Sequence, residues 1–138
     1  MIPVIYWSGT GNTKTMSEVV ADCIKSAGQE AALYEVSEIT AAEAAGYDAL
    51  ALGCPAMGAE VLEESEFEPF FQELEGSLAG KRVALFGSYG WGGTYMQDWE
   101  ARVKDAGAEL VAEGVLSLDA PDEEAVMKCM DLGKALAK

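Results

Sequence analysis

The stretch Ser8-Gly9-Thr10-Gly11-Asn12-Thr13 decides how this chain is interpreted. It directly follows the apolar run at residues 2–7, and a helical pattern follows it. The two glycines let the backbone turn so that amide groups converge, and a helix N-terminus adds partial positive charge. The order of strand, Gly/Ser/Thr loop and helix therefore predicts a phosphate-binding turn, with an ordinary strand-to-helix turn as the alternative.

The loop contains neither lysine nor arginine, which narrows the kind of phosphate site. A Walker A loop requires a lysine before Ser/Thr that reaches the β- and γ-phosphates. The dinucleotide fingerprint requires a third glycine three residues after the second, where this chain has Lys14. The sequence leaves a monophosphate site built from neutral donors, or the ordinary turn.

Length and hydropathy place the chain among globular proteins. It has 138 residues, half of them apolar, which predicts a single domain over residues 1–138 with a substantial core. No apolar run approaches the roughly 20 residues of a membrane span, and the first residues lack the basic region of a signal peptide. We therefore expect a cytoplasmic protein without a membrane partner.

The charge balance bears on the partners. The formal net charge is −15, from 24 acidic and 9 basic residues. Phosphate backbones are bound by Lys/Arg clusters, so this balance disfavours nucleic acid. It favours basic protein partners that are attracted electrostatically, with improved solubility as the alternative explanation.

The chain has three cysteines, Cys23, Cys54 and Cys129, and no histidine. An iron–sulfur cluster usually takes four cysteines and a zinc site four Cys/His ligands, so neither is expected. The absence of histidine also removes the commonest general base. We expect all three cysteines to be buried as small apolar side chains.

Strand-like and helical patterns alternate along the whole chain. We expect strands at 2–7, 31–36, 49–54, 82–87 and within 109–118. We expect helices at 12–27, 68–78 and 96–106, and a last helix that begins near Pro121 and runs through Val126, Met127, Met130, Leu132 and Leu136. This alternation predicts an α/β fold, a doubly wound five-stranded parallel sheet with helices on both faces. The loops at 8–13, 55–66 and 88–94 then meet at the carboxyl ends of the strands, where such folds bind ligands.

Two of these loops carry a large side chain among glycines. Trp91 lies between Gly90 and Gly92, which is unlike a residue of a helical core face. A tryptophan beside a phosphate site suggests a platform on which a flat ring stacks, and Met57 could cover the other face of that ring. The alternatives are that Trp91 closes the end of the sheet and that Met57 fills a gap in the core.

The chain resembles the flavodoxins, in particular the short-chain clostridial type, along essentially its whole length. The phosphate loop matches the family pattern T/S-x-T-G-N-T, and residues 53–58 and 86–92 are also similar to that family. The region 109–118 has no room for the long loop that splits the last strand of long-chain members. The resemblance implies strand order 2-1-3-4-5 with FMN at the switch point between the first and third strands; flavodoxin is itself a standard example of this order.

The resemblance also implies which residues hold the FMN. Hydroxyl, amide and backbone groups of residues 8–13 would bind the phosphate, and Met57 and Trp91 would enclose the isoalloxazine ring. Glu60 would accept from the flavin N3–H, and the Gly58–Ala59 peptide would turn on one-electron reduction. The complete implied set is Ser8, Gly9, Thr10, Gly11, Asn12, Thr13, Pro55, Ala56, Met57, Gly58, Ala59, Glu60, Ser88, Tyr89, Gly90, Trp91 and Gly92. Two departures are Pro55, where some relatives have serine, and a shorter loop after Trp91.

The implied function is that of a low-potential one-electron carrier, not an enzyme, whose FMN shuttles between semiquinone and hydroquinone. It would be a monomer that docks transiently on basic redox-partner proteins. The alternative is a flavin-dependent NAD(P)H or quinone reductase on a similar fold. A run of five glutamates, acting as negative charges near the reduced ring, is expected to lower its potential: Glu60, Glu63, Glu64, Glu66 and Glu68.

Overall fold

The computed structural model describes residues 1–57, 61–90 and 93–138. Its strands are β1 (Ile2–Tyr6), β2 (Ala31–Glu35), β3 (Ala49–Gly53), β4 (Arg82–Tyr89), β5 (Glu109–Leu110) and β6 (Val115–Leu118). Its helices are α1 (Asn12–Ser26), α2 (Ala41–Ala44), α3 (Phe67–Glu75), α4 (Tyr95–Asp105) and α5 (Glu123–Ala137), with a 3₁₀ turn at Val36–Glu38. All strand pairs are parallel, in the order β2-β1-β3-β4-β5, with β6 also paired to β4. The predicted fold class and strand order are confirmed.

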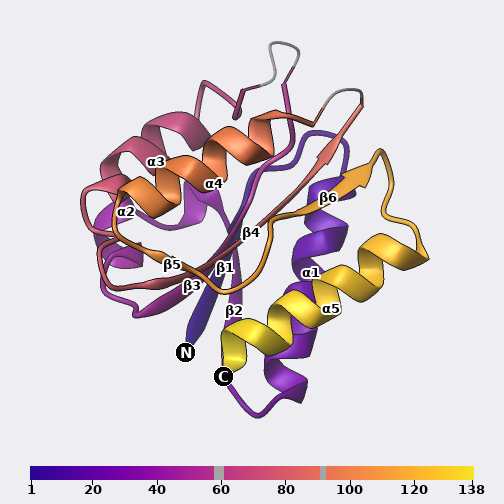
Figure 1. The fold of residues 1–138 in the computed structure, drawn as a ribbon, viewed down its shortest axis with the longest axis horizontal. Helices are drawn as coiled ribbons and strands as arrows, with labels where there is room; N and C mark the ends of the chain where they lie inside the picture. The colour runs from indigo at the N-terminus through magenta and orange to yellow at the C-terminus, as the bar shows by residue number, and fades with distance from the viewer. Residues whose placement is uncertain (58–60, 91–92) are drawn as a thin grey trace.

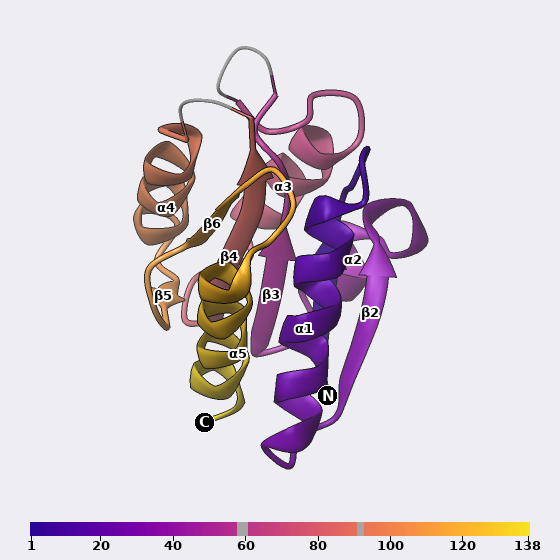
Figure 2. The same ribbon diagram turned by 90° about the vertical axis from the view of Figure 1, so that its right-hand side faces the viewer.

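Helices cover both faces of the sheet (Figure 1). Helices α1 and α5 lie side by side on one face, which Figure 2 turns toward the viewer, and α2, α3 and α4 lie on the other. Each face has its own buried cluster, one centred on Met16, Val20 and Leu132 and the other on aromatic side chains of α3 and α4. The central strands are therefore buried on both sides, as parallel strands usually are.

The close packing of α1 against α5 depends on Gly133. A Cβ at this position would lie 2.7 Å from the carbonyl oxygen of Val20 and 2.9 Å from Cβ of Cys23. Cys23 and Cys129 are buried here, and Cys54 is buried at the end of β3. The expectation that all three cysteines are buried is confirmed.

The last strand differs from the prediction because it is interrupted. Leu110 pairs with Val83, and Val115 pairs with Phe86. The edge strand uses five steps from Leu110 to Val115, whereas β4 uses three steps from Val83 to Phe86. The two extra residues of the edge strand form a bulge between β5 and β6. The amide of Gly114 leaves the ladder and donates to the Glu100 carboxylate at 2.8 Å.

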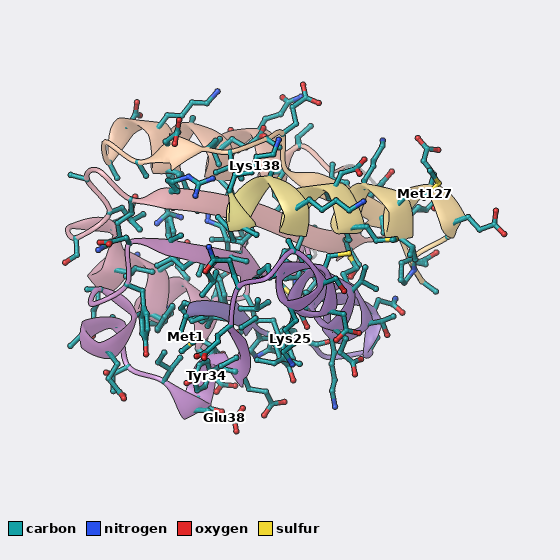
Figure 3. The ribbon with its side chains drawn as sticks, turned by 90° about the horizontal axis from the view of Figure 1, so that it is seen from below. Met1, Lys25, Tyr34, Glu38, Met127 and Lys138 are labelled. Atoms are coloured by element: carbon teal, nitrogen blue, oxygen red, sulfur yellow. The ribbon has the colours of Figure 1, made fainter. Side chains whose placement is uncertain are left out.

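The last helix exposes two of the apolar residues that it contains. Met127 is 64% exposed and Met130 is 38% exposed, and Figure 3 shows Met127 at the periphery of the molecule. The buried positions of α5 follow a helical period through Ala125, Cys129, Leu132, Gly133 and Leu136. Hydropathy favours burial of the two methionines, but their positions on the helix place them away from the sheet.

None of the helices in the described ranges is long and apolar enough to span a membrane.

Candidate functional site

A pocket of about 310 Å³ opens at the carboxyl ends of β1, β3 and β4. The loops that follow these strands gather at one end of the molecule, opposite the two termini (Figure 1). The pocket brings together eleven residues of the expected set: Ser8, Gly9, Thr10, Asn12, Thr13, Pro55, Ala56, Met57, Ser88, Tyr89 and Gly90. Gly11 lies in the same loop without lining the pocket, and Gly58, Ala59, Glu60, Trp91 and Gly92 lie outside the described residues.

The loop between β1 and α1 is folded by its own side chains. The Ser8 hydroxyl oxygen accepts the amide of Gly11 at 3.0 Å and the amide of Lys14 at 3.3 Å. Gly11 has a left-handed backbone with φ of 96°, which glycine adopts at little cost. The amides of Asn12 and Thr13 begin the helix, and none of the described residues accepts from them. These amides are the donors that a helix N-terminus offers to an anion.

A buried hydrogen bond connects this loop to β4. The hydroxyl oxygens of Thr13 and Ser88 are 3.1 Å apart, and both side chains are buried. The sequence pattern places Ser88 in a loop, but β4 continues to Tyr89 because its pairing with β6 extends to Leu118. The two sides of the pocket are therefore joined by a pair of hydroxyls.

The segment after β3 is held against β4 by backbone hydrogen bonds. The amide of Cys54 donates to the carbonyl of Phe86 at 3.1 Å, and the amide of Ala56 donates to the carbonyl of Ser88 at 2.9 Å. Met57 follows, and its side chain is 36% exposed and lines the pocket. Met57 therefore does not fill a gap in the core, which was one of the two alternatives.

Gly87 allows this segment to approach β4. The Tyr95 hydroxyl donates to the carbonyl oxygen of Cys54 at 2.9 Å. A Cβ on Gly87 would overlap both that carbonyl oxygen and the tyrosine hydroxyl. The contact between the end of β3, β4 and α4 therefore requires glycine at this position.

Comparisons with known proteins agree with this geometry. A family model described as flavodoxin matches residues 4–133. A flavodoxin from Clostridium beijerinckii is 47% identical over 97% of each chain, and one from Megasphaera elsdenii is 42% identical over 100% of this chain and 99% of the relative. The chain belongs to the flavodoxin family. The solution structure of two-electron-reduced Megasphaera elsdenii flavodoxin superimposes with a TM-score of 0.91 at 41% identity, covering 99% of this chain and 98% of that one. As a member of this family, the chain is an FMN-binding electron carrier.

The chemistry of the pocket fits FMN. The donors near the start of α1 are hydroxyls and amides, which suit a single phosphate group, and no lysine or arginine lines the described part of the pocket. Met57 and Tyr89 supply apolar surface for a flat ring. The described lining thus holds both polar groups for a phosphate and apolar surface for a ring.

Sequence reasoning missed two lining residues, Trp7 and Asp119. Trp7 supports the phosphate loop from below: a Cβ on Gly9 would lie 3.1 Å from its ring, and its indole N–H donates to the Glu66 carboxylate at 3.2 Å. Asp119 is the one charged side chain among the described lining residues. In the sequence, their position could have indicated both residues, because each directly follows the end of a strand.

Asp119 has an unusual backbone conformation. Its φ is 56°, and it is the only non-glycine residue in the described ranges with a positive φ. Its amide donates to the carbonyl of Tyr89 at 2.8 Å, which holds the turn after β6 against the end of β4. Aspartate tolerates the left-handed region better than most residues, and such conformations concentrate at functional sites.

Two carboxylates of the acidic run that follows β3 are held by partners in the structure. Glu68 forms a two-point ion pair with Arg102, with N–O distances of 2.7 and 2.8 Å. The hydrogen bonds from Arg102 lower the pKa of Glu68, and the cation offsets its negative charge. Glu63 is buried and accepts backbone amides at the start of α3. Exposed carboxylates remain at Glu64 and Glu66, and Glu60 lies outside the described residues.

Proposed function

We propose that this flavodoxin holds FMN non-covalently in the pocket at the ends of β1, β3 and β4 and works as a low-potential one-electron carrier. The observation that carries the proposal is the convergence of neutral phosphate donors and apolar ring contacts in one pocket. FMN, when bound, supplies the one-electron chemistry. The chain supplies binding, orientation and an electrostatic environment.

The phosphate is assigned to the N-terminal end of α1. The amides of Asn12 and Thr13, which donate to none of the described residues, belong to the first helical turn, and the Thr10 side chain is exposed on the loop that precedes them. Ser8 contributes partly by stabilising the conformation of the loop, because its hydroxyl oxygen already accepts the amides of Gly11 and Lys14. Neutral donors bind a phosphate without cancelling its charge, so the phosphate remains a negative neighbour of the ring.

The ring is assigned to the side of the pocket formed by Met57, Tyr89 and Gly90. Met57 is positioned by the bond between its amide and the carbonyl of Val61 at 2.9 Å. The carboxylate of Asp119 lies at the same pocket. Asp119 would place a negative charge beside a bound flavin ring, and Coulomb repulsion from it would disfavour an anionic form of that ring.

We propose basic redox proteins as transient partners. Exposed carboxylates stand on both sides of the pocket, at Glu64 and Glu66 after β3 and at Asp119 and Asp122 after β6. With a net charge of −15, such a rim attracts basic surfaces and speeds their encounter. The proposal includes action as a cytoplasmic monomer that is a carrier and not an enzyme.

An anaerobic reductive titration of the FMN-loaded protein tests this function. We expect stoichiometric FMN binding and two resolved one-electron steps in the visible spectrum. A colourless protein that does not bind added FMN would overturn the proposal. Steady-state oxidation of NAD(P)H by a quinone, without a separate reductase, would instead establish the enzyme alternative.

A salt titration tests the proposed partners. We expect the rate of electron transfer to a basic one-electron acceptor protein to fall as ionic strength rises, because screening weakens the attraction. The matched control is a small neutral acceptor, whose rate should change little. Equal salt dependence for the two acceptors would count against docking by the acidic rim.

A further inference from the structure

Glu63 is a buried carboxylate that the proposed chemistry does not use. Its side chain is 4% exposed, and no lysine or arginine of the described ranges forms an ion pair with it. Its oxygens instead accept the amides of Ser65 at 2.6 Å, Glu66 at 2.9 Å and Phe67 at 3.0 Å. A buried charge is costly unless hydrogen bonds satisfy it, and here the amides of Ser65 and Glu66, which precede α3, and of Phe67, its first residue, do so. Glu63 is therefore fixed to the N-terminus of α3.

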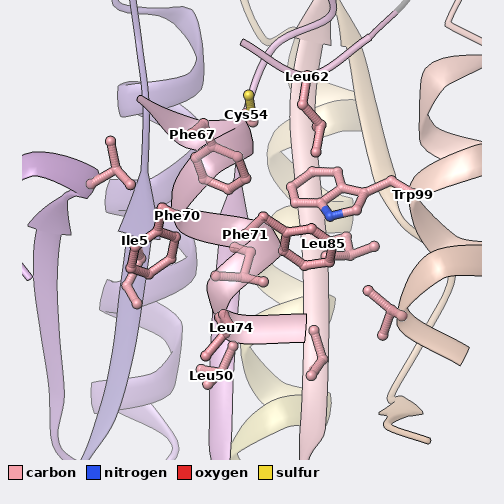
Figure 4. Close-up of a cluster of buried hydrophobic side chains, with 14 of the residues drawn as sticks. Ile5, Leu50, Cys54, Leu62, Phe67, Phe70, Phe71, Leu74, Leu85 and Trp99 are labelled. Atoms are coloured by element: carbon pink, nitrogen blue, oxygen red, sulfur yellow. The ribbon is translucent and has the colours of Figure 1, made fainter. Parts of the chain in front are cut away.

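The backbone of the same residue is fixed to the end of β3. The amide of Glu63 donates to Sγ of Cys54 at 3.3 Å, and Cys54 is completely buried. Burial raises the pKa of the Cys54 thiol, so the sulfur stays neutral. Leu62 packs into the aromatic cluster beside Trp99, as Figure 4 shows. Glu63 thus lies next to Cys54, where the chain leaves the sheet.

The segment enclosed by these contacts carries the apolar wall of the pocket. Ala56 and Met57 lie within it and line the pocket, and the bond between the amide of Met57 and the carbonyl of Val61 narrows it. Its start is held by β4 and its end by Glu63. If the end were released, the position of Met57 relative to the pocket would no longer be determined.

We propose that Glu63 is a positioning residue that holds Val61 and Leu62 in place and, through the bond between Val61 and Met57, keeps Met57 against the ring of FMN. Its carboxylate acts through the amides of α3 and not as a free negative charge beside the flavin. The inference rests on the proposed placement of FMN against Met57. The proposal assigns this role to Glu63 and not to its neighbour Glu64, which is exposed and forms no hydrogen bond or ion pair with any described residue.

The test compares Glu63→Gln with Glu64→Gln. Each variant removes one negative charge at adjacent positions, one buried and one exposed, and Glu63→Asp, which keeps the charge, separates positioning from a Coulombic effect. In E63Q the amide side chain keeps one acceptor oxygen but turns an NH₂ group toward backbone amides, so part of the cap is lost. We expect E63Q to weaken FMN binding by roughly tenfold, in line with the loss of a helix cap, and E64Q by less than about twofold.

The midpoint potential of the first electron is the second measurement. Displacement of the segment changes the affinities for the two redox states unequally, and a roughly tenfold change in their ratio is about 59 mV for one electron. A merely structural role would lower the stability of the apoprotein and leave this potential at the E64Q value. That result would overturn the proposal.

Glu63→Asp covers the case in which E63Q does not fold. Aspartate keeps the charge but is one methylene too short to reach all three amides. Positioning predicts weaker FMN binding in E63D, whereas a Coulombic role predicts wild-type binding. If the wild-type protein itself fails to bind FMN, the proposed function fails; if it binds FMN and E63D and E63Q bind like E64Q, only the role of Glu63 fails.

Discussion

The two sides of the pocket are built in different ways. The phosphate side is folded by contacts within a few residues, because Ser8 accepts the amides of Gly11 and Lys14. The ring side is held by distant partners, since Cys54 contacts Phe86 and Tyr95, which lie far along the chain. The difference teaches that the shape of one side depends on adjacent residues, whereas the position of the other side depends on how distant elements pack. Substitutions on the two sides should therefore fail in different ways.

The largest effect is expected from Gly87→Ala, on the ring side. The added methyl overlaps the Cys54 carbonyl and the Tyr95 hydroxyl, so β3, β4 and α4 must separate. We expect the free energy of unfolding of the apoprotein to fall by about 3 kcal/mol, measured by urea denaturation. Gly76→Ala is the control, because its φ is −67° and no atom lies near the added methyl. Equal stability of the two variants would contradict the proposed close contact.

Ser8→Ala tests the phosphate side. The variant leaves the amides of Gly11 and Lys14 without their acceptor, so the loop loses its internal support. We expect roughly tenfold weaker FMN binding, or about 1.4 kcal/mol, measured by quenching of flavin fluorescence. The apoprotein should unfold at nearly the wild-type urea concentration, because the loop is local. Ser26→Ala at the exposed far end of α1 is the control, and unchanged binding in both variants would contradict a role for the Ser8 hydroxyl.

Lowering the pH should reduce the stabilisation that the Glu63 carboxylate provides through its hydrogen bonds. Burial alone would raise the pKa of Glu63, but the amides of Phe67, Glu66 and Ser65 lower it overall. Its stabilisation is therefore complete above the pKa of the unfolded chain and is lost as pH falls through the lower, folded-state pKa. The nearby titratable groups are the Cys54 thiol and the carboxylates of Glu66 and Glu68.

The measurement is the difference in unfolding free energy between wild type and E63Q across pH. We expect wild type to be more stable by about 1 kcal/mol at neutral pH, with the difference shrinking toward acid. Glu64→Gln should show no such trend. A difference that grows as pH falls would contradict a lowered pKa for the Glu63 carboxyl.

The smallest effect is expected from Asp119→Asn. It removes the one charge on the described pocket lining while keeping a residue that tolerates a left-handed backbone. For a charge about 10 Å from the ring in water, the potential of bound FMN should rise by roughly 20 mV. Spectroelectrochemical titration measures this shift, and Asp131→Asn on the exposed side of α5 is the control. A fall in potential would show that Asp119 acts by something other than its charge.

Sequence alone was enough for the fold class and the phosphate loop. Alternating strand and helix patterns repeat along the chain, and crossover handedness leaves few topologies for such a pattern. The Gly11 turn and the start of α1 at Asn12 follow from local preferences, which are encoded in adjacent residues. The convergence of the three loops was predicted from the parallel topology, and the structure brings eleven of the expected residues into one pocket.

Tertiary structure alone decided what depends on distant partners. Glu63 and Glu68 read alike in the sequence, but one meets the amides of α3 and the other meets Arg102 of α4. The bulge between β5 and β6 could not be predicted from the sequence, because the register of these strands is set by their pairing with β4. Asp119 enters the pocket only because the turn after β6 is bonded to Tyr89. Composition and periodicity describe a chain's local preferences, whereas the partner of a charge is fixed only when the elements pack together.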